Sequence, residues 1–385
     1  MLIFIIPTSY PNEDNVVANS FVQEQVKALI LQGYDVVVLN VQKQPSKKLF
    51  YRIDRHIYKD KDNISDVVRK KQKTIIEKRL SLINQFIFDK SVKKLYCFAI
   101  KEYGTPDLIY AHFYKAGYSA IKATKKNSSS VPVVVMEHSG DLMDKIRTVD
   151  KFFLKYVIEK SKAYICTTDN LKESVLKITH SKKEIKVIPN VIDSIFEYSA
   201  LKRTNDMFCF FSLARLEFDK RLDLLIQAFC ETFSPEENVE LKIGGIGSEL
   251  QHLKHEIEDY NRSHQIKLLG QLNRTQVAEE MKNCNCFVLP SRHETFGLVW
   301  REALCVGRPV ITTNHGGFSG RDWEDSFGEM IPVDDLKSLS EALLSIKNNY
   351  SKYDLRYISD KNSEKYSLNS VGKQLSDLFK DSIDR

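Results

Sequence analysis

Short apolar runs alternate with segments of helix length along almost the whole chain, and this alternation restricts the possible folds more than any other feature of the sequence. The apolar run at residues 2–6 is followed by a stretch with helical periodicity at residues 21–30, and a second apolar run follows at residues 36–39. Strands that are separated by helices form parallel βαβ units, in which the sheet is buried on both faces and its strands are apolar throughout. The pattern therefore predicts an α/β fold.

The alternation runs through the chain twice. In the first half, further strands are expected at residues 107–112, 131–138, 163–168 and 185–190. The pattern then starts again, with strands expected at residues 207–215, 239–245, 266–270, 286–291 and 308–313. A chain of 385 residues is long for a single core, so we expect two doubly wound, Rossmann-like parallel-sheet domains in series, at residues 1–195 and 196–365.

Residues 43–104 interrupt this rhythm and are rich in Lys and Arg. Apolar residues recur at helical spacing over residues 75–87, so we expect a basic helical insertion in the first domain. Residues 1–195 carry 33 Lys and Arg against 21 Asp and Glu, whereas the rest of the chain carries 24 against 30. The basic residues are either the solvated faces of ordinary helices or a surface that holds anionic lipid or an acidic acceptor.

Other sequence features bear on location and on metal binding. No apolar stretch approaches the roughly 18 residues of a membrane-spanning helix, and the first apolar run lacks the positive charges of a signal peptide. The close pair Cys284 and Cys286 begins an apolar run, where buried thiols are expected instead of metal ligands. We expect a cytoplasmic protein, peripheral on the inner face of the cell membrane if its basic surface holds lipid.

Polar residues and glycines gather at three strand-to-helix junctions of the second domain. Arg215 and Lys220 follow its first strand, Gly247 follows the second, and Gly297 follows the strand that ends near residue 291. Ligands of open α/β sheets bind at such junctions, beyond the carboxyl ends of the strands. Two cations, together with helix-start amides and glycines that allow a close approach, suit a diphosphate.

Two carboxylates, Glu294 and Glu302, lie eight residues apart at the third junction. An ionised carboxylate accepts hydrogen bonds and donates none, so this pair suits groups rich in hydroxyls, such as ribose and hexose. Next to a diphosphate site, the two acids predict a pocket for a sugar nucleotide.

These residues bear a family resemblance. Residues 207–317 resemble the nucleotide-binding domain of the retaining GT-B glycosyltransferases marked by E-x7-E, known as glycosyltransferase family 4 or glycosyl transferases group 1. The matching pieces are LARLEFDKRLD, IGGIGSE, LLGQL and CFVLPSRHETFGLVWREALCVGRPVITTNHGG. The resemblance covers the whole chain in order and is closer after residue 185. It implies a GT-B fold, with two Rossmann-like domains facing a cleft and a C-terminal helix at residues 366–385 that packs back on the first domain.

The resemblance also implies roles for residues of the donor site in the second domain. Arg215 and Lys220 match the pair that binds the donor diphosphate and stabilises the leaving group. Glu302 matches the acid that holds the ribose hydroxyls, and Glu294 the acid that faces the donor hexose. The turn whose amides meet sugar and phosphate is matched by Phe296, Gly297 and Leu298.

In the first domain, which would face the acceptor, His138 in the segment MEHSGD resembles the histidine near the reacting centre. His112, at the end of another predicted strand, is the alternative. The first loop, PTSYPNEDNVVANSFV, has no glycine pair, and a minority pattern of the family places Asn19 and Ser20 at the turn that approaches the donor phosphate.

The implied reaction is the transfer of a hexose from a nucleoside-diphosphate sugar, with UDP ahead of GDP as the nucleotide, and with retention of configuration. No cofactor is expected. No metal ion is expected either, because metal-dependent transferases of the other major fold use a D-x-D directly after an apolar strand, whereas the single D-x-D here, at residues 60–62, follows no predicted strand. The expected acceptor is a glycan or a polyprenyl-diphosphate-linked molecule of bacterial surface polysaccharide biosynthesis, and no nucleic-acid partner is expected. The alternatives are a sugar-nucleotide-binding protein without turnover and an epimerase of the same fold.

Overall fold

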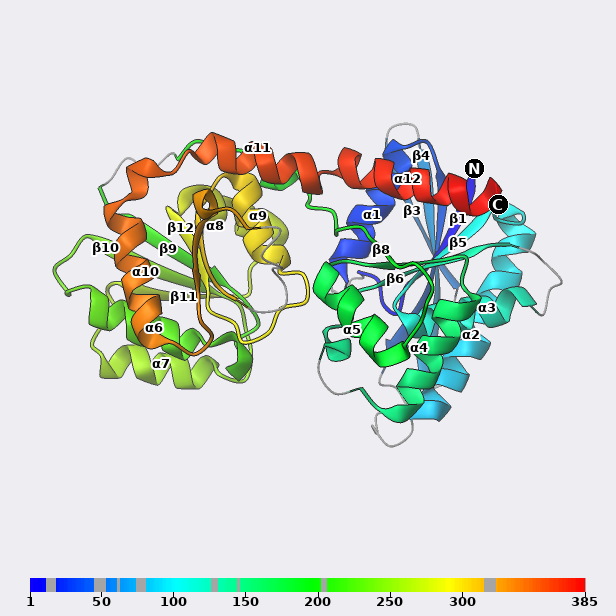
Figure 1. Cartoon of the computed structure of the whole chain (residues 1–385), viewed down its shortest axis with the longest axis horizontal. Helices are drawn as coiled ribbons and strands as arrows, with labels where there is room; N and C mark the ends of the chain where they lie inside the picture. The colour runs from blue at the N-terminus through cyan, green and yellow to red at the C-terminus, as the bar shows by residue number, and fades with distance from the viewer. Residues whose placement is uncertain are drawn as a thin grey trace. The chain divides into compact units, whose positions relative to one another are not determined.

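The computed structural model describes residues 1–11, 19–44, 53–60, 63–73, 81–125, 131–143, 146–201, 206–314 and 323–384. The chain divides into two compact units (Figure 1). The first unit comprises Met1–Val191 together with Leu368–Arg385, and the second comprises Ile192–Ser367.

The first unit is built on an eight-stranded sheet with the order β3-β4-β2-β1-β5-β6-β7-β8. Neighbouring strands are parallel, except that β3 and β4 pair antiparallel at one edge. The strands are β1 (Leu2–Ile6), β2 (Asp35–Gln44), β3 (Ile53–Asp60), β4 (Asn63–Lys73), β5 (Leu108–His112), β6 (Val133–Glu137), β7 (Ala163–Cys166) and β8 (Lys186–Val187).

Successive residues of the central strands face opposite layers of helices. In β1, Phe4 and Ile6 belong to one core, whereas Ile3 and Ile5 belong to the other. The first core lies against α2 (Ser81–Tyr103), α3 (Tyr114–Lys125), α4 (Thr148–Lys160) and α5 (Asp169–Thr179). The second lies against α1 (Ser20–Leu31) and α12 (Leu368–Asp384). Burial on both faces explains why β1 is apolar at every position.

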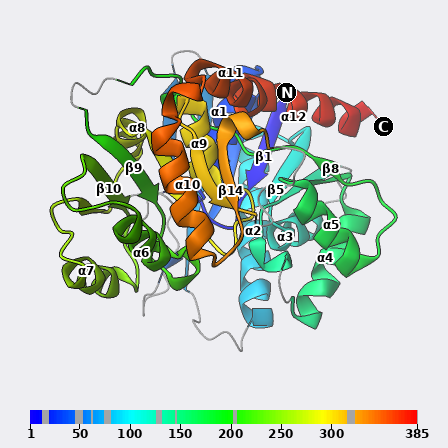
Figure 2. The ribbon, with the colours of Figure 1, turned by 60° about the vertical axis from the view of Figure 1, so that its left-hand side comes forward.

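The last helix of the chain, α12, packs along α1 in this first unit (Figures 1 and 2), as the family resemblance implies. A Cβ atom on Gly372 would lie 2.9 Å from the Ala28 carbonyl oxygen, so the glycine allows the two helices to approach closely. The hydroxyl groups of Tyr34 and Ser376 are hydrogen-bonded at 2.6 Å. The C-terminal segment is therefore part of the first core.

The expected helical insertion at residues 43–104 is wrong in part. Residues Ile53–Asp60 and Asn63–Lys73 are strands, and the described helix is confined to Ser81–Tyr103. The prediction relied on charge and on apolar spacing at residues 75–87, of which 75–80 lie outside the described residues. Pairing decides the strands instead, because β4 runs parallel to β2 (Asp35–Gln44), and a distant strand partner is not visible in the charge pattern of a segment.

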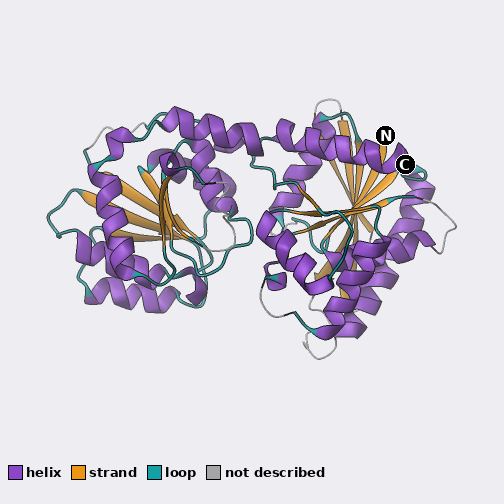
Figure 3. Cartoon of the chain, viewed as in Figure 1, coloured by secondary structure: helices purple, strands orange, loops and turns teal. Residues whose placement is uncertain are grey.

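The second unit contains a six-stranded, wholly parallel sheet with the order β11-β10-β9-β12-β13-β14 (Figure 3). Its strands are β9 (Phe208–Leu213), β10 (Val239–Gly244), β11 (Ile266–Gly270), β12 (Cys286–Leu289), β13 (Val310–Thr313) and β14 (Gly328–Ile331). Its helices are α6 (Leu222–Thr232), α7 (Leu250–Asp259), α8 (Arg274–Asn283), α9 (Leu298–Val306), α10 (Leu336–Asn348) and α11 (Leu355–Tyr366). Helices α6 and α10 lie side by side, and α9 packs against α8 and α11 (Figures 1 and 2).

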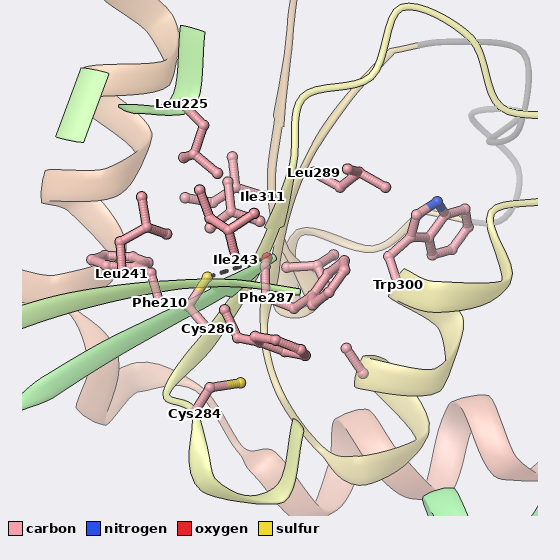
Figure 4. Packing of buried hydrophobic residues seen from close by; sticks show 14 of the residues in the cluster. Phe210, Leu225, Leu241, Ile243, Cys284, Cys286, Phe287, Leu289, Trp300 and Ile311 are labelled. Carbon is pink, nitrogen blue, oxygen red and sulfur yellow. Dashed lines mark hydrogen bonds between the residues drawn. The ribbon is translucent and has the colours of Figure 1, made fainter. Parts of the chain in front are cut away.

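The core of the second unit is rich in aromatic rings and also holds the thiols of Cys284 and Cys286 (Figure 4). Phe211 of β9 and Phe287 of β12 meet edge to face, with ring centroids 5.9 Å apart. Trp300 projects from α9 into the same cluster and is fully buried. The predicted α/β fold of two doubly wound sheets is thus confirmed. None of the described helices is long and apolar enough to cross a bilayer.

Candidate functional site

The winding of the second sheet brings two of its loops together. From β9 the chain moves outward through β10 and β11, and it then returns to place β12 on the other side of β9. The connections after β9 and β12 leave in opposite directions, and ligands of α/β sheets bind at such a switch point. Arg215 and Lys220 follow β9, and Glu294 follows β12. The predicted site residues therefore lie where the fold favours binding.

Lys220 and Glu294 are in direct contact at this switch point. The Lys220 Nζ atom donates a hydrogen bond to Glu294 Oε1 at 2.9 Å, and it also lies 3.3 Å from Asp219 Oδ2. The Ser291 hydroxyl donates to the same Glu294 oxygen at 3.3 Å. Only 12% of the Lys220 side chain is exposed, so its charge is held in place by the two loops instead of moving freely in solvent.

Arg215 is exposed and lies at the end of β9. Within the described residues, its guanidinium group makes no hydrogen bond or ion pair, and its carbonyl oxygen accepts from the Glu217 amide at 2.7 Å. A guanidinium group has five N–H donors in a planar arrangement that matches phosphate oxygens. Arg215 thus offers a cation to an external anion, whereas Lys220 is already paired with acids of its own chain.

The glycines after β10 allow two loops to stack. A Cβ atom on Gly247 would lie 2.2 Å from the Leu216 carbonyl oxygen, and one on Gly245 would lie 1.8 Å from that of Ala214. The Leu216 amide donates to the Ile246 carbonyl oxygen at 3.0 Å. Glycine at residue 247 is therefore required by the packing of this loop on the loop that carries Arg215. That Gly247 also contacts a ligand stays a prediction.

Helix α9 begins at a glycine in the left-handed region. Gly297 has a φ of 68°, it precedes Leu298, and no side chain caps the helix there. A Cβ atom on Gly297 would lie 1.9 Å from Trp300 Nε1, so the indole ring occupies the space that any other residue would need. Phe296 is buried beside it, with its ring centroid 3.9 Å from the guanidinium carbon of Arg301. The uncapped first turn of α9 leaves backbone N–H groups that suit an anion.

Glu302 lies further along α9 and is almost completely buried. Its Oε1 atom accepts a hydrogen bond from Arg274 Nη1 at 2.5 Å, whereas its Oε2 atom, also buried, has no partner among the described residues. Burial raises the pKa of Glu302, and the nearby Arg274 opposes this shift. Arg274 was not among the predicted site residues, because no spacing in the sequence connects the start of one helix with the middle of the next.

In the first unit, the two candidate histidines form a pair. His112 ends β5 and His138 follows β6, and His112 Nδ1 lies 3.0 Å from His138 Nε2. The ring of Phe21, from the first turn of α1, lies over His138 with 4.4 Å between centroids. Burial lowers the pKa of His112 to about 3, and burial together with His112 lowers the pKa of His138 well below its usual value. Both rings are therefore neutral at neutral pH.

A buried carboxylate, Glu137, organises the loop that carries His138. Its Oε1 atom accepts from the amides of His138 and Ser139, both at 3.0 Å. Its Oε2 atom accepts from the Tyr114 amide at 2.9 Å and from the Tyr164 hydroxyl at 2.8 Å. Burial raises the pKa of Glu137, and the four hydrogen bonds oppose this shift. Glu137 was missed because an acid at a strand end has no distinctive sequence signal.

Asn19 precedes α1 with a φ of 50°, in the left-handed region. Its Nδ2 atom donates to Ser9 Oγ at 2.7 Å and lies 3.4 Å from Thr8 Oγ1. Ser20 is the first residue of α1, and the helix has no side-chain cap. Residues 12–18 of the first loop lie outside the described residues. The turn predicted at Asn19 and Ser20 is thus present, and a role for it in binding phosphate stays a prediction.

Metal-ligand residues do not gather in the described part of the chain, where no group of three or more His, Cys, Asp or Glu is placed to hold an ion. Asp62 of the D-x-D sequence lies outside that part.

Two family models match the chain in succession. Residues 18–195 match the model described as Glycosyltransferase Family 4, and residues 196–365 match the model described as Glycosyl transferases group 1. An uncharacterized glycosyltransferase of Methanocaldococcus jannaschii is 27% identical over 262 residues, which are 68% of this chain and 70% of that protein. The gpi3 subunit of a phosphatidylinositol N-acetylglucosaminyltransferase of Schizosaccharomyces pombe is 29% identical over 166 residues, which are 43% of this chain. These residues are 36% of that relative, so the chain spans about a third of its length.

Solved structures of similar fold cover almost the whole chain. A sucrose-phosphate synthase of Thermosynechococcus elongatus has a TM-score of 0.78 at 18% identity, with 99% of this chain and 98% of that chain covered. The HepE protein of Anabaena in complex with UDP-glucose has a TM-score of 0.70 at 15% identity, with 98% and 99% covered. At this level of identity the likeness shows that the two-unit fold is shared.

Proposed function

The chain belongs to the glycosyl transferases group 1 family of GT-B glycosyltransferases, and we propose that it moves a hexose from a nucleoside-diphosphate sugar to a glycan or lipid-linked acceptor with retention of configuration. The observation that carries this proposal is the contact of Lys220 with Glu294 at the switch point of the second sheet, next to the loop of Arg215. Two cations and a carboxylate that can accept hydrogen bonds from sugar hydroxyl groups are thereby placed together.

The proposed role of the cations is to stabilise the departing nucleoside diphosphate. When the glycosidic bond breaks, negative charge develops on the leaving phosphate, and preorganised donors at that point lower the barrier. Arg215 is free to meet the phosphate oxygens, Lys220 is held in place by its own loops, and the first turn of α9 adds backbone amides. Glu294 would accept hydrogen bonds from hydroxyl groups of the hexose while it remains paired with Lys220. No metal ion is required in this scheme.

The proposed donor is a uridine or guanosine diphosphate sugar, with UDP as the first choice. The HepE structure of similar fold contains UDP-glucose, which supports this order for the present chain. The Oε2 atom of Glu302, which has no partner among the described residues, suits a ribose hydroxyl, because a buried acceptor without a donor is costly and a bound sugar would satisfy it. In the first unit, His138 is the proposed histidine of the reacting centre. Because its ring is neutral, it would act as a hydrogen-bonding partner and not as a charged acid, and the fully buried His112 would hold it in place.

The proposal is tested by incubating the protein with a panel of UDP- and GDP-sugars and measuring the release of nucleoside diphosphate, with water as the default acceptor. We expect release from at least one donor at a rate that EDTA leaves unchanged. Binding without release from any donor would instead support a sugar-nucleotide-binding protein. Formation of a new nucleotide sugar, without free nucleoside diphosphate, would support an epimerase.

We also propose that the first unit binds an anionic membrane surface, where a polyprenyl-diphosphate-linked acceptor of surface polysaccharide assembly would lie. The first two turns of α2 expose Leu82, Ile83 and Phe86, and the ammonium group of Lys90 lies 4.4 Å from the Phe86 ring centroid. Exposed apolar side chains beside lysines suit insertion between anionic head groups.

Replacing Leu82, Ile83 and Phe86 by serine is therefore expected to weaken sedimentation with phosphatidylglycerol-rich vesicles about tenfold or more, and salt should weaken the binding of the unchanged protein. Leu344→Ser is the matched control, because Leu344 is an exposed leucine of the second unit. Equal binding of the unchanged protein to neutral vesicles would contradict the proposal.

A further inference from the structure

Arg274 joins the start of one helix of the second unit to the middle of the next helix along the chain. It is the first residue of α8, and its guanidinium group reaches Glu302 in the middle of α9, where Nη1 donates to Oε1 at 2.5 Å. The Arg274 side chain is 34% exposed, whereas that of Glu302 is 2% exposed. The pair therefore has one end in the protein interior and the other at the surface.

The position of Arg274 is fixed by its surroundings. Asn273 caps α8, its side chain accepts from the Gln276 amide at 3.0 Å, and the Gln276 side chain accepts from the Asn273 amide at 2.9 Å. This reciprocal pair holds the backbone on both sides of Arg274. The guanidinium carbon also lies 4.6 Å from the ring centroid of Phe196. A planar cation against an aromatic face loses much of its rotational freedom, so its hydrogen bond to Glu302 is preorganised.

The Glu302 carboxylate is left half satisfied by this arrangement. Oε1 is occupied by Arg274, and Oε2 is buried without a partner among the described residues. A buried carboxylate oxygen without a donor is unfavourable, and a hydroxyl group of a bound ligand can supply the missing donor. Because the hydrogen bond from Arg274 fixes the position of Oε1, it also fixes the direction from which Oε2 can accept a hydrogen bond.

We propose that Arg274 is a positioning residue that orients the Glu302 carboxylate toward the ribose hydroxyls of the donor nucleotide, and so makes the site prefer ribonucleotides to their deoxy forms. This inference rests on the proposed function, which places a nucleoside diphosphate in the second unit. Arg274 itself acts through Glu302. Lysine would be a poor substitute, because a flexible point charge lacks the planar donor arrangement that both the carboxylate and Phe196 contact.

The test measures dissociation constants by calorimetry for UDP and GDP, and for the 2′-deoxy and 3′-deoxy forms of the nucleotide that binds. The unchanged protein is expected to bind the ribonucleotide about tenfold or more tightly than at least one deoxy form, as for the loss of one hydrogen bond to a charged group. In Glu302→Gln and in Arg274→Ala this preference should fall to within about threefold, and the double variant should lose no more than either single variant.

Arg356→Ala is the matched control, because Arg356 also lies over an aromatic ring, that of Tyr198, and pairs with a carboxylate, Asp360, in the same unit. It should keep the full preference. If the alanine variant does not fold, Arg274→Lys, which keeps the positive charge, takes its place. It too should lose most of the preference for the ribonucleotide. A well-folded Arg274 variant with an unchanged preference, alongside a Glu302→Gln protein that has lost it, would overturn this inference alone. Failure of the unchanged protein to bind either nucleotide would overturn the proposed function and this inference with it.

Discussion

Alanine in place of Arg215 or of Lys220 is expected to lower the rate of hexose transfer about 100-fold or more, because each change removes a cation that would stabilise the departing diphosphate. The two variants should differ in their secondary effects. The Arg215 side chain makes no hydrogen bond or ion pair within the described residues, so its loss should leave the stability of the protein unchanged. Lys220→Ala also leaves Glu294 without its ion-pair partner at 2.9 Å. The measurement is the release of nucleoside diphosphate under single-turnover conditions with the preferred donor.

Lys242→Ala is the matched control for Lys220→Ala. Lys242 belongs to the same unit, is also mostly buried, and pairs with Glu280 at 2.9 Å, but it lies within β10 and not in a loop at the switch point. It should keep the full rate. An unchanged rate in the well-folded double variant of Arg215 and Lys220 would show that neither cation stabilises the leaving group, and the proposed function would then lose its main support.

Gly297→Ala is expected to give the largest loss of stability among the site variants. Alanine in the left-handed region costs about 1–2 kcal/mol, and displacement of the fully buried Trp300, whose Nε1 would lie 1.9 Å from the new Cβ atom, adds about 1–3 kcal/mol by overpacking. The start of α9 must also shift, so the affinity for nucleoside diphosphate should fall. Urea unfolding and calorimetry measure the two effects.

Gly270→Ala separates the steric effect from the backbone effect. Gly270 has the same φ of 68°, and a Cβ atom there would have no neighbour within 4 Å. Its replacement should therefore lower the free energy of unfolding only by the cost of alanine in the left-handed region, and it should leave ligand binding unchanged. If the two variants lost equal stability, Trp300 would have room to move, and α9 would not be held as tightly as these contacts indicate.

Much of the candidate site could be predicted from the sequence, because its residues follow strands that the βαβ pattern predicts. Parallel strands place their carboxyl ends on one edge of the sheet, so residues after different strands converge there. This reasoning placed Lys220 and Glu294 at junctions of the same sheet, and in the structure they are hydrogen-bonded at 2.9 Å. It could not reveal Arg274, whose contact with Glu302 depends on the reach of one side chain between two helices.

The residues around the histidines were less predictable. The sequence offered His112 and His138 as competitors, but pairing of β5 with β6 places them 3.0 Å apart, so that they form one hydrogen-bonded pair. Glu137 had no signal of its own, because its four hydrogen-bond donors come from three different segments of the chain. A buried acid is recognised only when its donors are known.

The sequence by itself determined the two α/β halves, most strand positions and the junctions that carry the polar residues, because these depend on periodicities within short segments. Tertiary structure alone decided the strands at Ile53–Asp60 and Asn63–Lys73, the pairing of the two histidines, and the hydrogen bond between Arg274 and Glu302. It also decided why Gly247 must be glycine, since the obstacle is the backbone of Leu216 in another loop. The physical reason is the same in each case: such contacts join segments far apart in the chain, and their energies exist only once the fold has brought those segments together.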